Sequence, residues 1–398
     1  MFATLSEFLS NGLLHLTWWQ TAVCATLLTH ATIISVTIYL HRTEAHHALR
    51  LHPAVSHCFR FWLWMTTGIV TGQWAAVHRK HHAKCETSED PHSPQFRGLR
   101  RVLFEGAELY RLEVKNEETV RRFGRGTPAD WIERNAYARY PNLGISLLLV
   151  IYVALFGLAG LSVWAVQMLW IPFFAGGVVN GAGHFWGYRN FHTPDASTNL
   201  GPIGILIGGE ELHNNHHAFP TSAKLSRKWY EFDFGWVYIC MLSAVGLAEV
   251  RKIPPAPGRL VGKYTIDEAT LLAVLGHRHE VVEACVRAIS QALRQELFQT
   301  VQISNRDLIL LTQRVEECFC ACPHSPSRLA RPKLQSSLEQ DKKIRSYIEL
   351  SESLVSLWER SNASREQLLQ QLQTWCQRAE HSGSQPLVEF SLRLRQYD

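Results

Sequence analysis

Residues 18–47 read WWQTAVCATLLTHATIISVTIYLHRTEAHH, an apolar run that leads directly into a group of histidines. The first 23 of these residues, Trp18–Leu40, include no Asp, Glu, Lys or Arg. A helix of this length rises about 1.5 Å per residue and so spans a hydrocarbon core of roughly 30 Å. We therefore predict a membrane-spanning helix that ends at a polar, histidine-bearing segment.

A second apolar stretch, Leu143–Ala182, contains 40 uncharged residues and is interrupted by Gly157 and Gly160. It is long enough for two crossings joined by a tight turn. We predict these spans at about 143–160 and 163–182.

The charged residues of the first 250 positions are unevenly placed. Lys and Arg crowd the segments after Leu40 and after Arg189, whereas the turn between the two later spans carries none. By the positive-inside rule the charged segments face the cytoplasm. We expect residues 41–142 and 183–250 to form a cytoplasmic helical cap on the spans.

The segment Phe59–Val77 is also apolar, but histidine groups flank both of its ends. A crossing would put these groups on opposite faces of the membrane. We therefore interpret Phe59–Val77 as a buried or interfacial helix of the cap and predict an all-α integral membrane protein with few spans. The amino-terminal sequence lacks the basic region of a secretory signal, so we expect the first apolar segment to be retained.

The C-terminal third differs in composition from the rest. IPPAPG at 253–258 is typical of a linker, and the residues after it are polar with a helical pattern. We predict a linker at 251–264 and a soluble, helical C-terminal region at 265–398 of unknown role. Two capping boxes mark predicted helix starts: Thr265 with Glu268, and Ser364 with Gln367.

The net charge of +5 is modest and, with the long apolar runs, favours a membrane protein over a nucleic-acid binder. The nine cysteines include no CxxC pair. Their closest group, Cys318, Cys320 and Cys322, fits neither a zinc ribbon nor an iron–sulfur cluster, so we interpret the cysteines as ordinary thiols.

Twenty histidines are many for this length. Nine of them, with one asparagine, fall into four groups. These are His41 and His46 in HRTEAHH, His78, His81 and His82 in HRKHH, Asn180 and His184 in NGAGH, and His213, His216 and His217 in HNNHH. In HRKHH and HNNHH the i, i+3, i+4 spacing puts three imidazoles on one helical face; Asn180 and His184 likewise share a face. His41 and His46 lie about 140° apart on an ideal helix, so they serve one site only by straddling it or through a local distortion.

The chemistry of imidazole gives a reason for these groups. Neutral imidazole is a good ligand for first-row transition metals, and nine histidines exceed the four ligands of a structural zinc site. They fit two metals. The Glu-x-x-His motif of soluble di-iron bundles is not evident among these groups. Nearby carboxylates are predicted to accept the remaining ring N–H groups: Glu44, Glu86, Glu89, Asp90, Glu210 and Glu211.

Four motifs, in order, resemble the membrane fatty acyl desaturase family, specifically its stearoyl-CoA Δ9 branch. They are HRTEAH, HRKHHAKCETSEDPHSP, NGAGHFWGYRNF and GGEELHNNHHAFP, and the resemblance covers roughly residues 15–250. It implies a desaturase domain at 1–250 in which two iron ions (Fe2+) are held by nine histidines, with an asparagine acting through a water. By motif the metal site comprises His41, His46, His78, His81, His82, Asn180, His184, His213, His216 and His217.

The resemblance implies O2-dependent insertion of a cis double bond, at Δ9, into a saturated long-chain acyl-CoA. Alternatives are an acyl-lipid desaturase, a membrane-bound lipid or alkane hydroxylase, and a non-catalytic metal transporter; a transporter would place ligands near mid-membrane instead of at span ends. The chain has no haem attachment motif and no GxGxxG, so a separate ferredoxin or cytochrome b5-like donor with its reductase is implied. We expect a bacterial inner-membrane enzyme whose active site faces the cytoplasm.

Two features depart from the family pattern. Ala76 and Val77 stand where animal acyl-CoA enzymes have an Arg-Asp pair that grips the CoA head group. A basic run further along could hold phosphate instead, or could contact lipid head groups: Arg97, Arg100 and Arg101. His47 adds an imidazole to the first group, and we interpret it as a polar helix-exit residue.

Overall fold

The computed structural model describes residues 2–253, 258–300, 342–358 and 363–398, together with 309, 312 and 315. Residues 254–257 of the predicted linker and the group Cys318, Cys320 and Cys322 lie outside the described residues. The chain divides into two compact units. Unit 1 comprises Met1–Arg189 and Ser197–Pro254, and unit 2 comprises Asn190–Ala196 and Pro255–Asp398.

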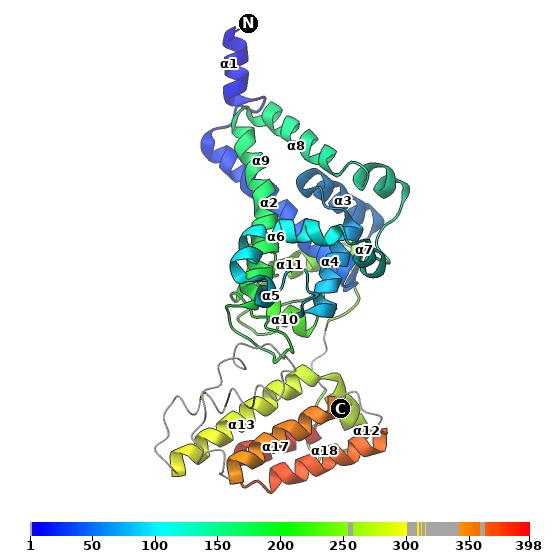
Figure 1. Ribbon diagram of the computed structural model, residues 1–398, viewed down its shortest axis with the longest axis vertical. Helices are drawn as coiled ribbons and strands as arrows, with labels where there is room; N and C mark the ends of the chain where they lie inside the picture. Colours follow the sequence, from blue (N-terminus) through cyan, green and yellow to red (C-terminus); the bar gives the residue numbers. More distant parts are fainter. Residues whose placement is uncertain are drawn as a thin grey trace. The chain divides into compact units, whose positions relative to one another are not determined.

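The first apolar segment of unit 1 forms one long helix (Figure 1). After α1 (Phe2–Asn11), the α-helix α2 (Trp18–Ser35) continues into the π-helix η1 (Val36–Ala45). Trp18–Ala45 is 28 residues long and apolar enough to cross a membrane. The helix therefore carries the predicted span and extends to the first histidine group.

The second apolar stretch forms a helical hairpin. Its arms are α8 (Pro141–Phe156) and α9 (Ala159–Trp170), which lie side by side, and α9 continues into the π-helix η3 (Ile171–Val179). The turn needs Gly157, because its φ is +64° and a Cβ there would lie 2.5 Å from the Leu9 carbonyl oxygen. Ala159–His184 is also long and apolar enough to cross a membrane, whereas α8 is shorter than such a helix.

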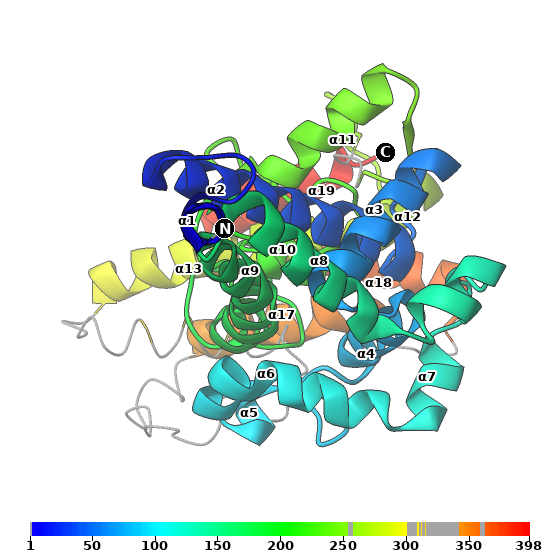
Figure 2. The ribbon, with the colours of Figure 1, turned by 90° about the horizontal axis from the view of Figure 1, so that it is seen from above.

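Shorter elements carry the site of unit 1. The helices are α3 (Pro53–Thr67), α4 (Thr71–Lys84), α5 (Pro94–Arg97), α6 (Leu99–Val114), α7 (Glu117–Phe123), η2 (Glu133–Tyr137), η4 (Ala182–His184), α10 (His213–Ala218) and α11 (Phe234–Ala244). Figure 2 shows α6 and α7 along one side of this unit, with α4 packed against α7. These elements hold the histidine groups at the ends of the long helices.

The prediction of an all-α fold is right for most of the described chain but missed two small sheets. Strand β1 (Leu49–Leu51) pairs antiparallel with β4 (Ala248–Val250), and β2 (Ile203–Gly204) pairs parallel with β3 (Phe232–Asp233). The first pair joins the segment after the HRTEAHH histidines to the end of unit 1. Segments this short carry no alternating pattern that a sequence could show.

The prediction that Phe59–Val77 forms one helix is wrong. Helix α3 ends at Thr67 and α4 begins at Thr71. Between them Gly68 has φ +62°, a left-handed conformation that ends a helix and that glycine adopts without strain. The close approach of Pro141, whose carbonyl oxygen would lie 2.9 Å from a Cβ at this position, also requires glycine.

Unit 2 has an apolar interior. Its helices are α12 (Glu268–Gly276), α13 (Arg278–Thr300), α17 (Lys342–Val355), η5 (Ser356–Trp358), α18 (Arg365–Glu380) and α19 (Gln385–Arg395). Leu271, Ile289, Tyr347, Trp375 and Phe390 are among the buried residues of its core. The segment Asn190–Ala196 clusters with this unit, which the sequence did not indicate.

The two predicted capping boxes have different outcomes. Ser364 and Gln367 form the box at the start of α18. The box of Thr265 with Glu268 is wrong, because α12 begins at Glu268 with Asp267 as its N-cap, and the Asp267 carboxylate accepts from the Thr270 N–H. A carboxylate next to the first helical residue satisfies this N–H directly.

Candidate metal centre

A π-helix brings the first two histidines together. The His46 backbone N–H donates to the His41 carbonyl oxygen at 3.1 Å, the i→i+5 bond of a π-helix. The two imidazole centroids are consequently 4.9 Å apart. The spacing of His41 and His46 left open whether they straddle one site or meet through a local distortion of the helix. The π-helix is such a distortion.

Five histidines from three elements form cluster A: His41, His46, His78, His82 and His216. Their ligand atoms all lie within 4.8 Å of one another. The Nε2–Nε2 distances along the cluster are 2.8 Å (His46–His78), 3.2 Å (His78–His82), 2.9 Å (His82–His216) and 3.1 Å (His216–His41). The end of η1, α4 and α10 thus contribute to one potential metal site.

A second group, cluster B, consists of His81, Cys85, His184 and His217. Its ligand atoms also lie within 4.8 Å of one another. His213 lies beside it, with its Nε2 2.9 Å from the Nε2 of His184. A third group, His81, Asp90 and His92, shares His81 with cluster B, so the described residues include three candidate groups, of which clusters A and B offer nitrogen and sulfur donors alone.

The helices α4 and α10 each divide their histidines between the clusters. On α4, His78 and His82 join cluster A and His81 joins cluster B; on α10, His216 joins cluster A and His217 joins cluster B. Neighbouring residues on a helix point about 100° apart, so one helix between two sites serves both. The shared face predicted for each triplet does not correspond to a single site.

The predicted shared face of Asn180 and His184 assumes a regular α-helix. They lie at the end of one continuous helix, Ala159–His184, whose period changes from the π-helix η3, which ends at Val179, to the 3-10 turn η4, which ends at His184. The Asn180 amide nitrogen donates to the Gly176 carbonyl oxygen at 3.3 Å. Asn180 lines the cavity next to the clusters, together with His41, His78 and His213.

Three buried carboxylates lie against the ring nitrogens that face away from the clusters. The Nδ1 atoms of His41, His81 and His184 are 2.7, 3.0 and 2.9 Å from carboxylate oxygens. The partners are Glu210, Asp90 and Glu86, respectively. A carboxylate in this place keeps the proton on Nδ1 and turns the Nε2 lone pair toward the metal site.

The prediction that Glu44, Glu89 and Glu211 also accept a histidine N–H is wrong. Glu89 accepts from Lys84 at 3.0 Å on the surface. The Glu211 carboxylate accepts the backbone N–H groups of the loop before α10, from Ile207 and Gly209. Glu44 is buried and interacts with Arg79. Sequence proximity to a histidine could not separate these acids from the three that contact one.

Burial favours the neutral form of four histidines of cluster A. It lowers the pKa of His46, His78, His82 and His216 well below that of ordinary histidine, and neighbouring histidines lower each pKa further. Burial disfavours the charge of Asp90, but His81 outweighs this effect, so the pKa of Asp90 is lowered. Neutral imidazoles beside anionic carboxylates are the form that binds metal.

The donor set fits a cation. Each Nε2 has either one N–H or one lone pair, yet His78, His82 and His216 each face two neighbouring Nε2 atoms. Hydrogen bonds cannot satisfy all of these contacts, whereas a metal ion accepts every lone pair. Nitrogen and sulfur donors suit transition metals and not calcium or magnesium.

Other side chains fix η1 and α10 in their places. Arg42 is buried and donates from Nη2 and Nη1 to the two Asp233 carboxylate oxygens at 2.8 and 3.1 Å. The two asparagines of HNNHH anchor the helix, because the backbone N–H groups of Asn214 and Asn215 donate to the Asn199 side chain. These contacts connect segments far apart in sequence, so the motif alone did not indicate them.

Sequence reasoning missed two residues at the site. Cys85 belongs to cluster B. His92 is buried with its ring centroid 4.5 Å from that of His81, and the pKa of this histidine is lowered by burial to about 3. Both lie within HRKHHAKCETSEDPHSP. Cys85 is four positions after His81, a helical spacing that could have indicated it, whereas His92 has no such spacing to the other histidines. His47, by contrast, is exposed and bonds Arg79 at 3.0 Å, as expected for a helix-exit residue.

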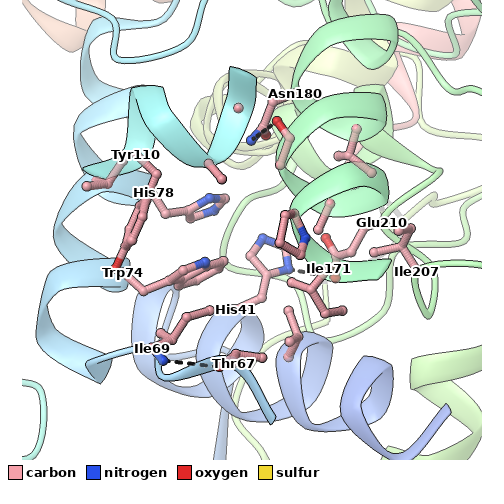
Figure 3. A pocket seen from close by; sticks show the side chains of 18 of the residues that line it. His41, Thr67, Ile69, Trp74, His78, Tyr110, Ile171, Asn180, Ile207 and Glu210 are labelled. Atoms are coloured by element: carbon pink, nitrogen blue, oxygen red, sulfur yellow. Dashed lines mark hydrogen bonds and ion pairs between the residues drawn. The ribbon is translucent and has the colours of Figure 1, made fainter. Parts of the chain in front are cut away.

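A cavity of about 410 Å³ adjoins the histidines (Figure 3). Its polar end includes His41, His78, His213, Asn180 and Glu210. Its other walls come mostly from the hairpin and α6 and are mainly apolar, including Ile145, Trp164, Met168, Ile171 and Val179. Trp74 stacks on His78 where the two meet, with ring centroids 5.0 Å apart. A long apolar ligand could thus lie with one part next to the metal ligands.

Long apolar helices, two histidine-rich clusters able to bind a metal and an adjoining apolar cavity define a helical, membrane-type protein with a candidate metal centre. The family model for fatty acid desaturase matches residues 16–239, and the chain belongs to the fatty acid desaturase family. It is therefore an oxidoreductase that acts on fatty acyl chains with O2, and the two long apolar helices are in keeping with a membrane protein. The helices of unit 2 lie outside the matched residues.

Named relatives match a similar share of the chain. The Delta-9 desaturase-like 1 protein of Arabidopsis thaliana is 28% identical over 254 residues, which cover 59% of this chain and 78% of that protein. The acyl-CoA C20 Delta5-desaturase of Anemone leveillei is 29% identical over 249 residues (60% and 75%). The Delta-9 acyl-lipid desaturase 1 of Arabidopsis thaliana is 27% identical over 234 residues (56% and 72%).

Proposed function

We propose that this protein inserts a cis double bond at Δ9 of a saturated long-chain acyl-CoA at a centre of two iron ions (Fe2+). The ligands proposed are His41, His46, His78, His81, His82, His184, His213, His216 and His217, with Asn180 acting through a water. The observation that carries the proposal is the pair of histidine clusters beside one apolar cavity.

Desaturation needs both the metal clusters and the apolar cavity. No side chain can remove hydrogen from an unactivated methylene, so iron with O2 supplies that oxidising power when it is bound. The protein binds the acyl chain in the cavity, excludes water from it and fixes the methylene to be oxidised near the polar end. Glu86, Asp90 and Glu210 hold the protons of their histidines on Nδ1.

Exposed basic residues support CoA as the carrier of the acyl chain. Ala76 and Val77 are buried on α4, so they do not replace the Arg-Asp pair of animal acyl-CoA enzymes. Arg97, Arg100 and Arg101 are exposed around the start of α6, and their positive charges suit the phosphates of CoA. We place these residues, with the clusters, on the cytoplasmic side of a bacterial inner membrane.

An acyl-lipid substrate is the second candidate. The loss of the Arg-Asp pair favours it, since a lipid needs no CoA grip, and one relative is named an acyl-lipid desaturase. Either substrate requires electrons, and we propose that a separate ferredoxin or cytochrome b5-like protein with its reductase supplies them.

Expression in a desaturase-deficient bacterium tests the proposal. Mass spectrometry of the acyl chains should show a new Δ9 cis double bond in aerated, iron-replete cells and none with His81→Ala. Hydroxylated chains, or unsaturation that survives this substitution, would overturn the proposal. Purified protein given stearoyl-CoA or a stearoyl phospholipid, with reductant, then identifies the carrier.

A further inference from the structure

Cys85 is the non-histidine member of cluster B. It is the first residue after α4, four positions after His81, and is partly buried. Its Sγ lies 3.9 Å from the His81 Nε2, and its ligand atom lies within 4.8 Å of those of His184 and His217. The thiol therefore occupies the position of a fourth donor around the three imidazoles.

The distance is compatible with a shared metal ion. Metal–sulfur and metal–nitrogen bonds of about 2.3 and 2.1 Å allow two donors of one ion to be at most roughly 4.4 Å apart. The 3.9 Å between Cys85 Sγ and His81 Nε2 falls inside this limit and corresponds to a wide sulfur–metal–nitrogen angle. Only a small movement would be needed to complete the bond.

The loop after Cys85 is fixed by the same carboxylates that orient the cluster histidines. Glu86 has φ +57°, and its backbone N–H donates to Asp90 at 3.1 Å. The Glu86 carboxylate accepts from Ser93 at 2.6 Å and contacts His184 at 2.9 Å, while Asp90 contacts His81. A non-glycine residue keeps this conformation only when its surroundings hold it there. The position of the thiol is thus built into the surroundings of cluster B.

We propose that Cys85 is a thiolate ligand of the metal ion held by His81, His184 and His217, with His213 beside them as a further ligand of the same ion. The metal–sulfur bond forms as the thiol releases its proton to solvent, and neither partner changes oxidation state in this step. The inference rests on the proposed two-metal function and adds a ligand to it. It makes the two metals unequal, because a negatively charged sulfur donor stabilises the higher oxidation state of the metal in cluster B alone.

Cobalt titration of the purified full-length protein tests this assignment. Co2+ is added to metal-free protein in detergent while absorption is recorded. We expect a near-ultraviolet sulfur-to-cobalt charge-transfer band, and X-ray absorption should detect a sulfur neighbour of cobalt at about 2.3 Å. Cys85→Ser should lose both signals and keep the visible bands of nitrogen-bound cobalt. Cys58→Ser, an exposed cysteine on α3, is the matched control and should keep both signals.

The outcomes separate the two proposals. Cobalt bound in the wild type without a sulfur signal overturns the role of Cys85 and leaves the two-metal site intact. Failure to bind cobalt, or binding that His81→Ala and His82→Ala do not reduce, overturns the proposed metal centre itself. If Cys85→Ser does not fold, the wild type still overturns the assignment when its bound cobalt has no sulfur neighbour.

Discussion

Clusters A and B share the helices α4 and α10 but have different donors. Cluster A consists of imidazoles, and among its described contacts a carboxylate, Glu210, lies against one of them, His41. Cluster B has three imidazoles and a thiol, and two carboxylates, Glu86 and Asp90, lie against its histidines. More negative charge thus surrounds cluster B. Repeated histidine motifs therefore do not imply equivalent metal sites.

Removal of a cluster A ligand should give the largest effect. We expect His46→Ala to lower desaturation by more than about 100-fold, because even loss of a group that only orients a ligand costs 10–100-fold. Iron analysis should show that the metal of cluster A is lost and that of cluster B retained. The adjacent His47→Ala is the control and should be nearly silent, because His47 is exposed and bonds Arg79. Loss of both metals in His46→Ala would show that the clusters are not separate sites.

Changes to the orienting carboxylates should sharpen the difference between the clusters. Asp90→Asn should weaken metal binding by about 10–100-fold in cluster B, because the amide no longer fixes the His81 proton. Glu210→Gln should do the same in cluster A through His41. Isothermal titration with Co2+ measures each site. Glu89→Gln serves as the control because Glu89 contacts Lys84 on the surface, and weakening by this variant would contradict the assignment.

Acid should destabilise the metal-free protein. The pKa of His46, His78, His82 and His216 is lowered in the folded state, so the unfolded chain binds more protons below its ordinary histidine pKa of about 6.5. Stability is therefore complete above this pH and falls as the pH drops through and below it, by up to about 1.4 kcal/mol per pH unit for each group. Thermal unfolding in detergent between pH 7.5 and 5.5 measures this, and a constant melting temperature would contradict it.

The stacking of Trp74 on His78 should give the smallest effect. The rings are nearly parallel, 9° apart, at 5.0 Å. Trp74→Leu should cost about 0.5–1.5 kcal/mol of packing beyond the change in buried area. We expect activity to fall only a few-fold with the iron content unchanged. A loss of iron comparable to that of His46→Ala would mean that the tryptophan, and not the imidazoles alone, holds cluster A together.

The long helix and the helical hairpin could be predicted from local sequence. The uncharged length of Trp18–Leu40 and the glycines within Leu143–Ala182 led to the long helix and the hairpin, because helix length and turns depend on neighbouring residues. The failure at Phe59–Val77 has the opposite cause. Gly68 ends α3 where Pro141 packs closely against it, a contact between residues 73 positions apart.

The sequence by itself determined which side chains are available for the metals, since four motifs carry them at recognisable spacings. Only the tertiary structure decided how those side chains divide into two clusters, which three acids contact a histidine, and that Cys85 joins cluster B. The physical reason is distance along the chain. His41 and His82 meet His216 from 175 and 134 residues away, so their contacts depend on how η1, α4 and α10 pack and not on any local period.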